Sequence, residues 1–398
     1  MAKLLAVEEP GPRPQARGTT LLALGFRPFY LLASAFAALS IPLWVAQYSG
    51  HWPAGFPLRG AAWHGHEMLF GYTQAVLAGF LFTAGRTWTG QPTPTGIPLL
   101  GLALLWVAGR VLVLTPWAIA AALVNAAFPV AVAIGLAIPL HQSRNRRNYF
   151  FVGLLILLGT AVLAMHLSWM GIVAWPERAS LQAGLDVVLF ILAVMGGRVI
   201  PMFTNNGIPG TKASRHPLLE KFALGSVLLL LAADVLPAPT TVIATIALVA
   251  ASAHAIRLYL WQPWRTFATP LVWVLHAAYA WIVVYLVLRA LSVLGLVAGP
   301  LAVHALTIGA IGGMTIGMMV RTARGHTGRP LLADRFELAC FVLVHGAALI
   351  RVFGGLFVPD AYLATVVGSG ICWSIAFGLY ALRYWPVLSR ARIDGKPG

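Results

Sequence analysis

Long apolar stretches separated by short polar connections run through the whole chain. Twelve of them reach roughly 18 residues or more, the length with which an α-helix crosses a bilayer. They lie at 28–48, 62–84, 97–115, 117–140, 148–171, 179–203, 218–236, 239–260, 267–291, 299–320, 335–356 and 361–386. The pattern predicts an all-α protein, a polytopic membrane helical bundle of about 12 transmembrane helices.

The composition supports this class. Hydrophobic residues make up 59% of the chain and charged residues only 10%, whereas a soluble protein carries about 25% charged residues. The net charge of +16 could indicate a nucleic-acid partner. However, the basic residues stand singly or in small groups between the apolar stretches and form no basic face. We therefore expect the lipid bilayer, and no nucleic acid, as a partner.

The basic residues also predict an orientation. Twenty-one of the 27 Lys and Arg residues lie in the tails or in and beside the connections after even-numbered stretches, and five lie after odd-numbered ones. Because positively charged connections stay in the cytoplasm, we expect both termini there. This gives a cytoplasmic tail at 1–25, one membrane domain at 26–386 and a second cytoplasmic tail at 387–398.

An internal repeat is visible within the membrane domain. A shift of 238 residues matches six positions in a window of 25, among them His66 with His304 and Gly71 with Gly309. A fainter third copy ends in Gly197-Arg198, like Gly85-Arg86. Four helices return the chain to the same side of the membrane. We therefore expect three parallel four-helix units, at 26–140, 147–262 and 267–386.

Two histidines and a glutamate lie close together at the start of the second stretch, in Trp63-His64-Gly65-His66-Glu67. Such groups are costly in hydrocarbon, so they usually face a bundle interior and serve a function there. On a regular helix His64 and His66 point about 200° apart. They would share one ion only if this turn were irregular, which Pro57, Gly60 and Gly65 would allow. Glu67 could orient a ligating imidazole, carry protons or pair with a nearby arginine.

Other histidines lie inside or at the ends of apolar stretches. The topology places His64, His66 and His304 at outer helix ends and His166 near another, with His276 and His345 nearer mid-depth. Neutral imidazole is the commonest metal ligand and suits haem iron and copper alike. Because the repeat makes His66 and His304 equivalent, they are the first expected haem ligands. The next candidates, for copper or a second axial position, are His64 and His276.

Several further residues are candidates with an alternative explanation. Met314 and Met318 could donate sulfur to a metal or simply fill the core. Asp186 and Arg198 in the sixth stretch could pair with a haem propionate, a proton or another side chain. His326 lies in a basic, glycine-rich connection that suits an anionic lipid surface.

Taken together, these motifs resemble the NnrS family. The resemblance is carried by 63–72, by Gly196-Gly197-Arg198-Val199-Ile200-Pro201, by His304-Ala305-Leu306-Thr307-Ile308-Gly309 and by Gly325-His326-Thr327-Gly328-Arg329. It spans nearly the whole chain. The resemblance implies a bacterial inner-membrane protein that contains non-covalent haem b and copper and takes part in nitric oxide metabolism and resistance to nitrosative stress. The family's motif histidines correspond to His64, His66, His276, His304 and His326.

The resulting hypothesis is a haem and copper protein that binds or handles nitric oxide or iron-nitrosyl products and receives electrons from an unknown donor. Two alternatives remain open from the sequence. Repeated helices with buried carboxylates are also typical of secondary transporters, and a haem–copper pair could serve a nitric oxide reductase-like oxidoreductase. These three functions would use the same candidate residues differently.

Overall fold

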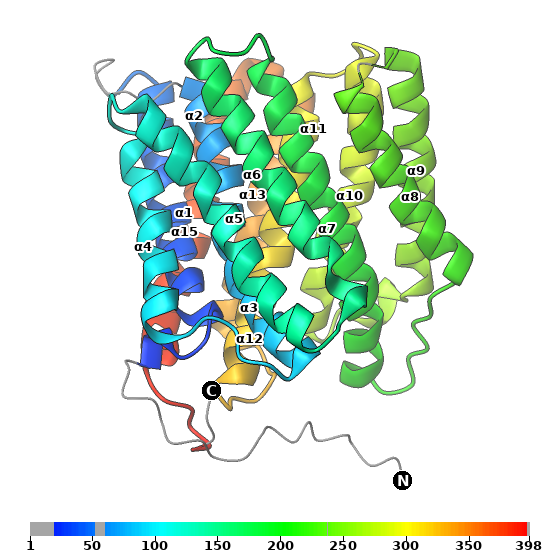
Figure 1. Ribbon diagram of the computed structural model, residues 1–398. Helices are drawn as coiled ribbons and strands as arrows, with labels where there is room; N and C mark the ends of the chain where they lie inside the picture. The colour runs from blue at the N-terminus through cyan, green and yellow to red at the C-terminus, as the bar shows by residue number, and fades with distance from the viewer. Residues whose placement is uncertain (1–19, 52–59, 237, 396–398) are drawn as a thin grey trace.

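The computed structural model describes residues 20–51, 60–236 and 238–395. Twelve helical rods fill this part of the chain and no strand occurs in it, which confirms the polytopic helical bundle. Ten rods are long and apolar enough to cross a membrane. The rods stand roughly parallel, as Figure 1 shows.

The helix bounds follow the apolar stretches closely. The rods are α1 (Phe26–Tyr48), α2 to α3 (Gly60–Thr89), α4 (Gly96–Leu112), α5 (Ala118–Gln142), α6 (Phe150–Trp169), α7 (Glu177–Gly207), α8 (Pro217–Val235), α9 (Thr240–Leu260), α10 (Pro270–Val293), α11 to α12 (Gly299–His326), α13 to α14 (Arg335–Phe357) and α15 (Tyr362–Ser389). Short 3₁₀ turns at Thr20–Leu22, Arg146–Asn148, Pro263–Arg265 and Pro359–Ala361 occupy connections.

Three rods meet at the centre of the bundle: α2 to α3, α7, and α11 to α12. Gly184 of α7 lies against Phe70, and the Tyr72 and Thr315 hydroxyls are hydrogen-bonded at 2.6 Å. The Arg321 guanidinium lies over the Phe203 ring. Each central rod is the second of one predicted four-helix unit.

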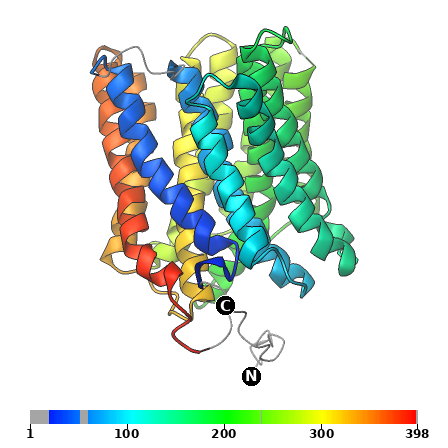
Figure 2. The ribbon, with the colours of Figure 1, turned by 60° about the vertical axis from the view of Figure 1, so that its left-hand side comes forward.

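The outer rods follow a cyclic order. The most extensive contacts join α1 to α15, α5 to α6 and α9 to α10, and the first of these pairs is visible in Figure 2, where the blue and red ends of the chain lie together. In each pair the first helix of one predicted unit packs on the last helix of another. This arrangement supports three units, although their boundaries stay a prediction.

Two central rods contain a π-helical segment, at Glu67–Thr73 and at Ala305–Gly312. A shift of 238 residues carries the first segment onto 305–311, inside the second. A π turn bonds i to i+5, so it leaves the ordinary α-helical ladder, and such turns are frequent at functional sites. Here the Gly71 carbonyl accepts a hydrogen bond from Trp106 Nε1 at 3.0 Å, and the Thr73 hydroxyl donates to the Met68 carbonyl at 2.8 Å.

One end of the bundle, here called the terminal face, holds the start of α1 and the end of α15. There Arg27 Nη1 donates to the carbonyls of Leu388 and Arg390 at 2.8 and 2.9 Å. The start of α13 is fixed on this face by a capping box, in which the Asp334 and Glu337 side chains each accept from the other's backbone N–H.

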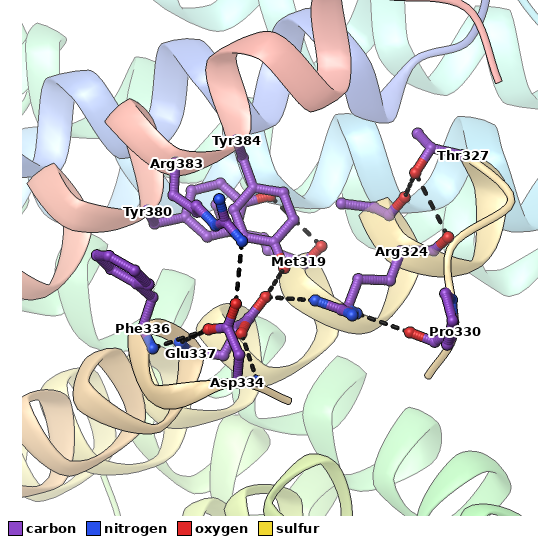
Figure 3. Close-up of polar contacts among 11 residues, drawn as sticks. Met319, Arg324, Thr327, Pro330, Asp334, Phe336, Glu337, Tyr380, Arg383 and Tyr384 are labelled. Atoms are coloured by element: carbon purple, nitrogen blue, oxygen red, sulfur yellow. Dashed lines mark hydrogen bonds and ion pairs between the residues drawn. The ribbon is translucent and has the colours of Figure 1, made fainter. Parts of the chain in front are cut away.

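The buried Glu337 also ties three helices together at the terminal face. Its Oε1 accepts from Arg324 of α12 and from the Tyr384 hydroxyl of α15, both at 2.7 Å, as Figure 3 shows. Because a buried carboxylate is costly unless it is paired and hydrogen-bonded, this network holds the ends of α12, α13 and α15 at one level.

Candidate functional site

Two imidazoles from different central rods lie close together at the face opposite the termini. The His64 ring of α2 and the His304 ring of α11 have centroids 6.2 Å apart and planes inclined by 16°. On its other side His64 stacks on Trp44 of α1 at 4.2 Å. His304 Nδ1 donates to the Pro300 carbonyl at 2.6 Å, which leaves Nε2 as the nitrogen with a lone pair.

Unsatisfied polar atoms gather around this pair. Four buried nitrogens here have no hydrogen-bond partner among the described residues: His64 Nδ1, Trp44 Nε1, Trp63 Nε1 and Arg351 Nη1. The other terminal nitrogen of Arg351 donates to the Tyr362 hydroxyl at 2.5 Å. Buried polar groups are nearly always paired in native structures. The concentration of orphaned nitrogens therefore marks a place for a further group.

The separation of the two rings agrees in length with that of two imidazoles on one metal. A metal–imidazole bond of about 2.0 Å, with about 1.1 Å from nitrogen to ring centre, puts the centroids of two such imidazoles roughly 6.2 Å apart. Because imidazole lone pairs lie in the ring plane, the stacked rings would have to turn to direct both nitrogens at one ion. Within the described residues no group of three or more His, Cys, Asp or Glu side chains could hold a metal. The protein would thus supply two ligands, and other coordination positions would remain for a macrocycle or a small molecule.

His66 belongs to a different cluster. Its Nε2 lies 3.0 Å from Nε2 of His166 on α6, and its Nδ1 donates to Glu67 Oε1 at 2.7 Å. The other oxygen of Glu67 accepts from Arg110 of α4 at 2.7 Å, and Arg110 also donates to the Asn125 side chain of α5. A buried chain of polar groups therefore crosses from α6 to α5.

The expected pairing of His66 with His304 is thus not the one in the structure. Both ring nitrogens of His66 are already engaged, with Glu67 and His166, whereas His304 faces His64. The cause is the angular offset between His64 and His66, which directs them to different neighbours.

His276 lies far from the other candidates. It sits in the second turn of α10, where its ring nitrogens contact the carbonyls of Val272 and Trp261 and the Thr204 hydroxyl at 3.1 to 3.3 Å. Gly65, beside His64, packs near Leu181 of α7. Thr204 follows 23 residues later on α7, which corresponds to about 35 Å of helix. The structure thus places His276 near the terminal face and far from His64, rather than near mid-depth.

Arg198 and His326 have structural contacts near the terminal face. Arg198 Nη1 donates to the Asn148 side chain at 2.7 Å, and its guanidinium lies over the rings of Phe150 and Phe151. The His326 ring packs against Phe26 at 5.6 Å.

The methionines and the remaining polar candidates lie apart from the stacked imidazoles. Met314 is buried in the core and Met318 packs half-buried against it. His345 accepts a hydrogen bond from Trp281 Nε1 at 3.3 Å. Asp186 lies in a separate cluster with Asp234 and Arg289.

Sequence reasoning did not identify Trp44 and Arg351 as members of the site, nor His166 as the partner of His66. Arg351 carried a signal, because an arginine inside an apolar stretch needs a partner as much as a histidine does. Trp44 carried none, since a tryptophan near a helix end is equally typical of a membrane interface.

Comparison with known protein families gives one match that covers nearly the whole chain. The family model described as "NnrS protein" matches residues 20–392. No curated protein matches the chain. The matched region includes both imidazole pairs.

Proposed function

The chain belongs to the NnrS family and is a multi-pass membrane protein related to nitric oxide, and from this premise we propose a more specific function. It is a haem- and copper-containing protein of the bacterial inner membrane, with both termini in the cytoplasm. It binds nitric oxide or iron-nitrosyl products and so contributes to resistance against nitrosative stress.

The observation that carries this proposal is the stacked pair of His64 and His304, surrounded by unsatisfied nitrogens. Imidazole nitrogen suits both haem iron and copper. The free N–H of Arg351 suits an anionic group such as a haem propionate. A metal held by these imidazoles would supply a coordination position for nitric oxide.

The residues around the pair have separate roles. The Pro300 carbonyl holds His304 in the tautomer whose Nε2 is free to ligate. Trp44 covers one face of the His64 ring, which keeps water away from it. Arg351, held by the Tyr362 hydroxyl, places a fixed positive charge beside the site. With both termini in the cytoplasm, the pair lies toward the periplasmic side.

The test compares wild-type protein with His64→Ala, His304→Ala and, as a matched control, His276→Ala. Each purified variant is analysed for iron and copper, for the reduced-minus-oxidised optical spectrum and for the spectral change on addition of nitric oxide. We expect His64→Ala and His304→Ala to lose the same metal and the nitric oxide response, and His276→Ala to keep both. Unchanged metal content and spectra in the first two variants would refute the assignment.

A further inference from the structure

A further buried polar cluster joins α7, α8 and α10 on the side of the bundle away from the terminal face. Asp186 Oδ1 accepts from Gln182 Nε2 at 2.9 Å, and Asp234 Oδ1 accepts from Arg289 Nη2 at 2.5 Å. The other terminal nitrogen of Arg289 donates to Gln182 Oε1 at 2.6 Å. Gln182 Nε2 also donates to the Tyr285 hydroxyl at 3.1 Å.

The two carboxyl groups of this cluster are linked through Gln182 and Arg289. Asp186 is fully buried and the Asp234 side chain is 8% exposed. The Oδ2 atoms of both residues have no N–H or O–H donor of the protein beside them in the described part of the chain. An ionised carboxylate can only accept, so each of these unpartnered Oδ2 atoms is a position at which a proton can bind.

The charge balance indicates that one of these two carboxyl groups carries a proton. The charged and titratable groups that face Asp186 are Asp234 from α8 and Tyr285 and Arg289 from α10. Two ionised carboxylates beside one guanidinium would leave a net negative charge buried in the bundle. Like charges in contact at low dielectric do not both ionise, and an uncompensated buried charge is strongly destabilising. One proton makes the cluster neutral.

We propose that Asp186 and Asp234 form a proton-binding site that holds one proton on one of their two Oδ2 atoms at neutral pH. The site does not depend on the metal-binding function proposed above, since it shares no residue with the imidazole pairs.

The position of the site indicates the side from which the proton exchanges. Asp234 lies in the last turn of α8, and Asp186 lies nine residues into α7, about 13 Å along the helix from its first residue. The Arg289 side chain is 16% exposed. The proton therefore exchanges with the face opposite the termini.

Infrared spectroscopy of the purified full-length protein tests the proposal directly. Wild-type protein at neutral pH should show the carbonyl band of a protonated carboxylic acid, and this band should shift in D₂O. It should disappear in both Asp186→Asn and Asp234→Asn, because one carboxylate beside the Arg289 guanidinium leaves the cluster neutral without a proton. Asp334→Asn is the matched control. This surface carboxylate is paired with Arg383 at 3.0 Å, so its loss should leave the band unchanged.

Both Asn variants keep the cluster neutral, so we expect them to fold with an unchanged helical circular dichroism spectrum. Absence of the band in wild-type protein would overturn the proposal. So would a band that persists in both folded Asn variants, or one that sodium ions abolish, since that would assign a cation to the site. None of these outcomes depends on the metal content that tests the proposed function.

Discussion

Removal of one charge from the buried Glu67–Arg110 pair should strongly destabilise the protein. The two side chains are 1% and 9% exposed and meet at 2.7 Å. Breaking a buried pair costs about 3–5 kcal/mol because the remaining charge stays in a poorly solvated site. Each partner here keeps a second hydrogen bond, Glu67 with His66 and Arg110 with Asn125. We therefore expect the lower end, about 3 kcal/mol, for Glu67→Gln or Arg110→Met alone.

The double variant distinguishes this reasoning from simple loss of contacts. When both charges are removed, no buried charge is left unpaired, so Glu67→Gln with Arg110→Met should cost clearly less than the two single changes added together. The coupling should lie at about 2–3 kcal/mol, within the range for residues in direct contact.

The assay is the free energy of unfolding in mixed micelles, measured by circular dichroism as denaturing detergent is added. Arg383→Met serves as the control, because the Arg383–Asp334 pair is 50% and 39% exposed and an exposed pair contributes less than about 1 kcal/mol. Additive single effects, or a single-variant cost no larger than that of the control, would refute the account of the pair.

Two further predictions concern packing and capping. An added Cβ at Gly309 would lie 2.3 Å from Cγ of Trp281, whereas an added Cβ at Gly101 would meet nothing within 4 Å. Gly309→Ala should therefore lower the stability of the fold by about 1–3 kcal/mol, and Gly101→Ala should not. Melting curves of both variants in detergent would test this. The pKa of Asp334, at the start of α13, is lowered to about 2. The Glu337 side chain and the backbone N–H groups that Asp334 caps lower this pKa, against the raising effect of burial. The contribution of the ionised Asp334 to the stability of the fold is thus present above the usual carboxyl pKa and is lost as the pH falls toward 2. Asp334→Ala should lower the stability by about 1 kcal/mol at neutral pH and by less in strong acid. Melting curves recorded across pH would measure this difference.

The sequence predicted the helical bundle well because bilayer thickness imposes one dominant signal, the length of the apolar run. All twelve predicted stretches correspond to rods with similar bounds. The largest difference is at the tenth, predicted to end at 320 although the rod continues to His326. Arg321 and Arg324 end the apolar run but not the helix, because the backbone hydrogen bonds continue past the hydrocarbon boundary.

The site was less predictable because its residues meet only through helix packing. The sequence indicated that His64 and His304 are functional, but the choice of partner depends on angles between rods. The sequence named no partner for Asp186, yet Asp234, 48 positions later, is linked to it through Gln182 and Arg289. The level of each residue along its helix did indicate which polar side chains could meet. Asp186 near the start of α7, Asp234 at the end of α8 and Arg289 near the end of α10 all lie at one level on the side away from the termini.

The π segments affect how the two halves of each of these central rods are rotated relative to one another. A wide turn accommodates one extra residue, which offsets the two halves of a rod by about 100° relative to a continuous α-helix. In the rod Gly60–Thr89, the half that precedes the segment directs His64 toward His304. The half that follows the segment directs Gly79 toward Tyr30 of α1. Deleting one residue from 67–73 would restore the regular helix and rotate one of these faces away from its neighbour. Chain length in this short segment therefore determines which side chains meet, as firmly as their chemical identity does.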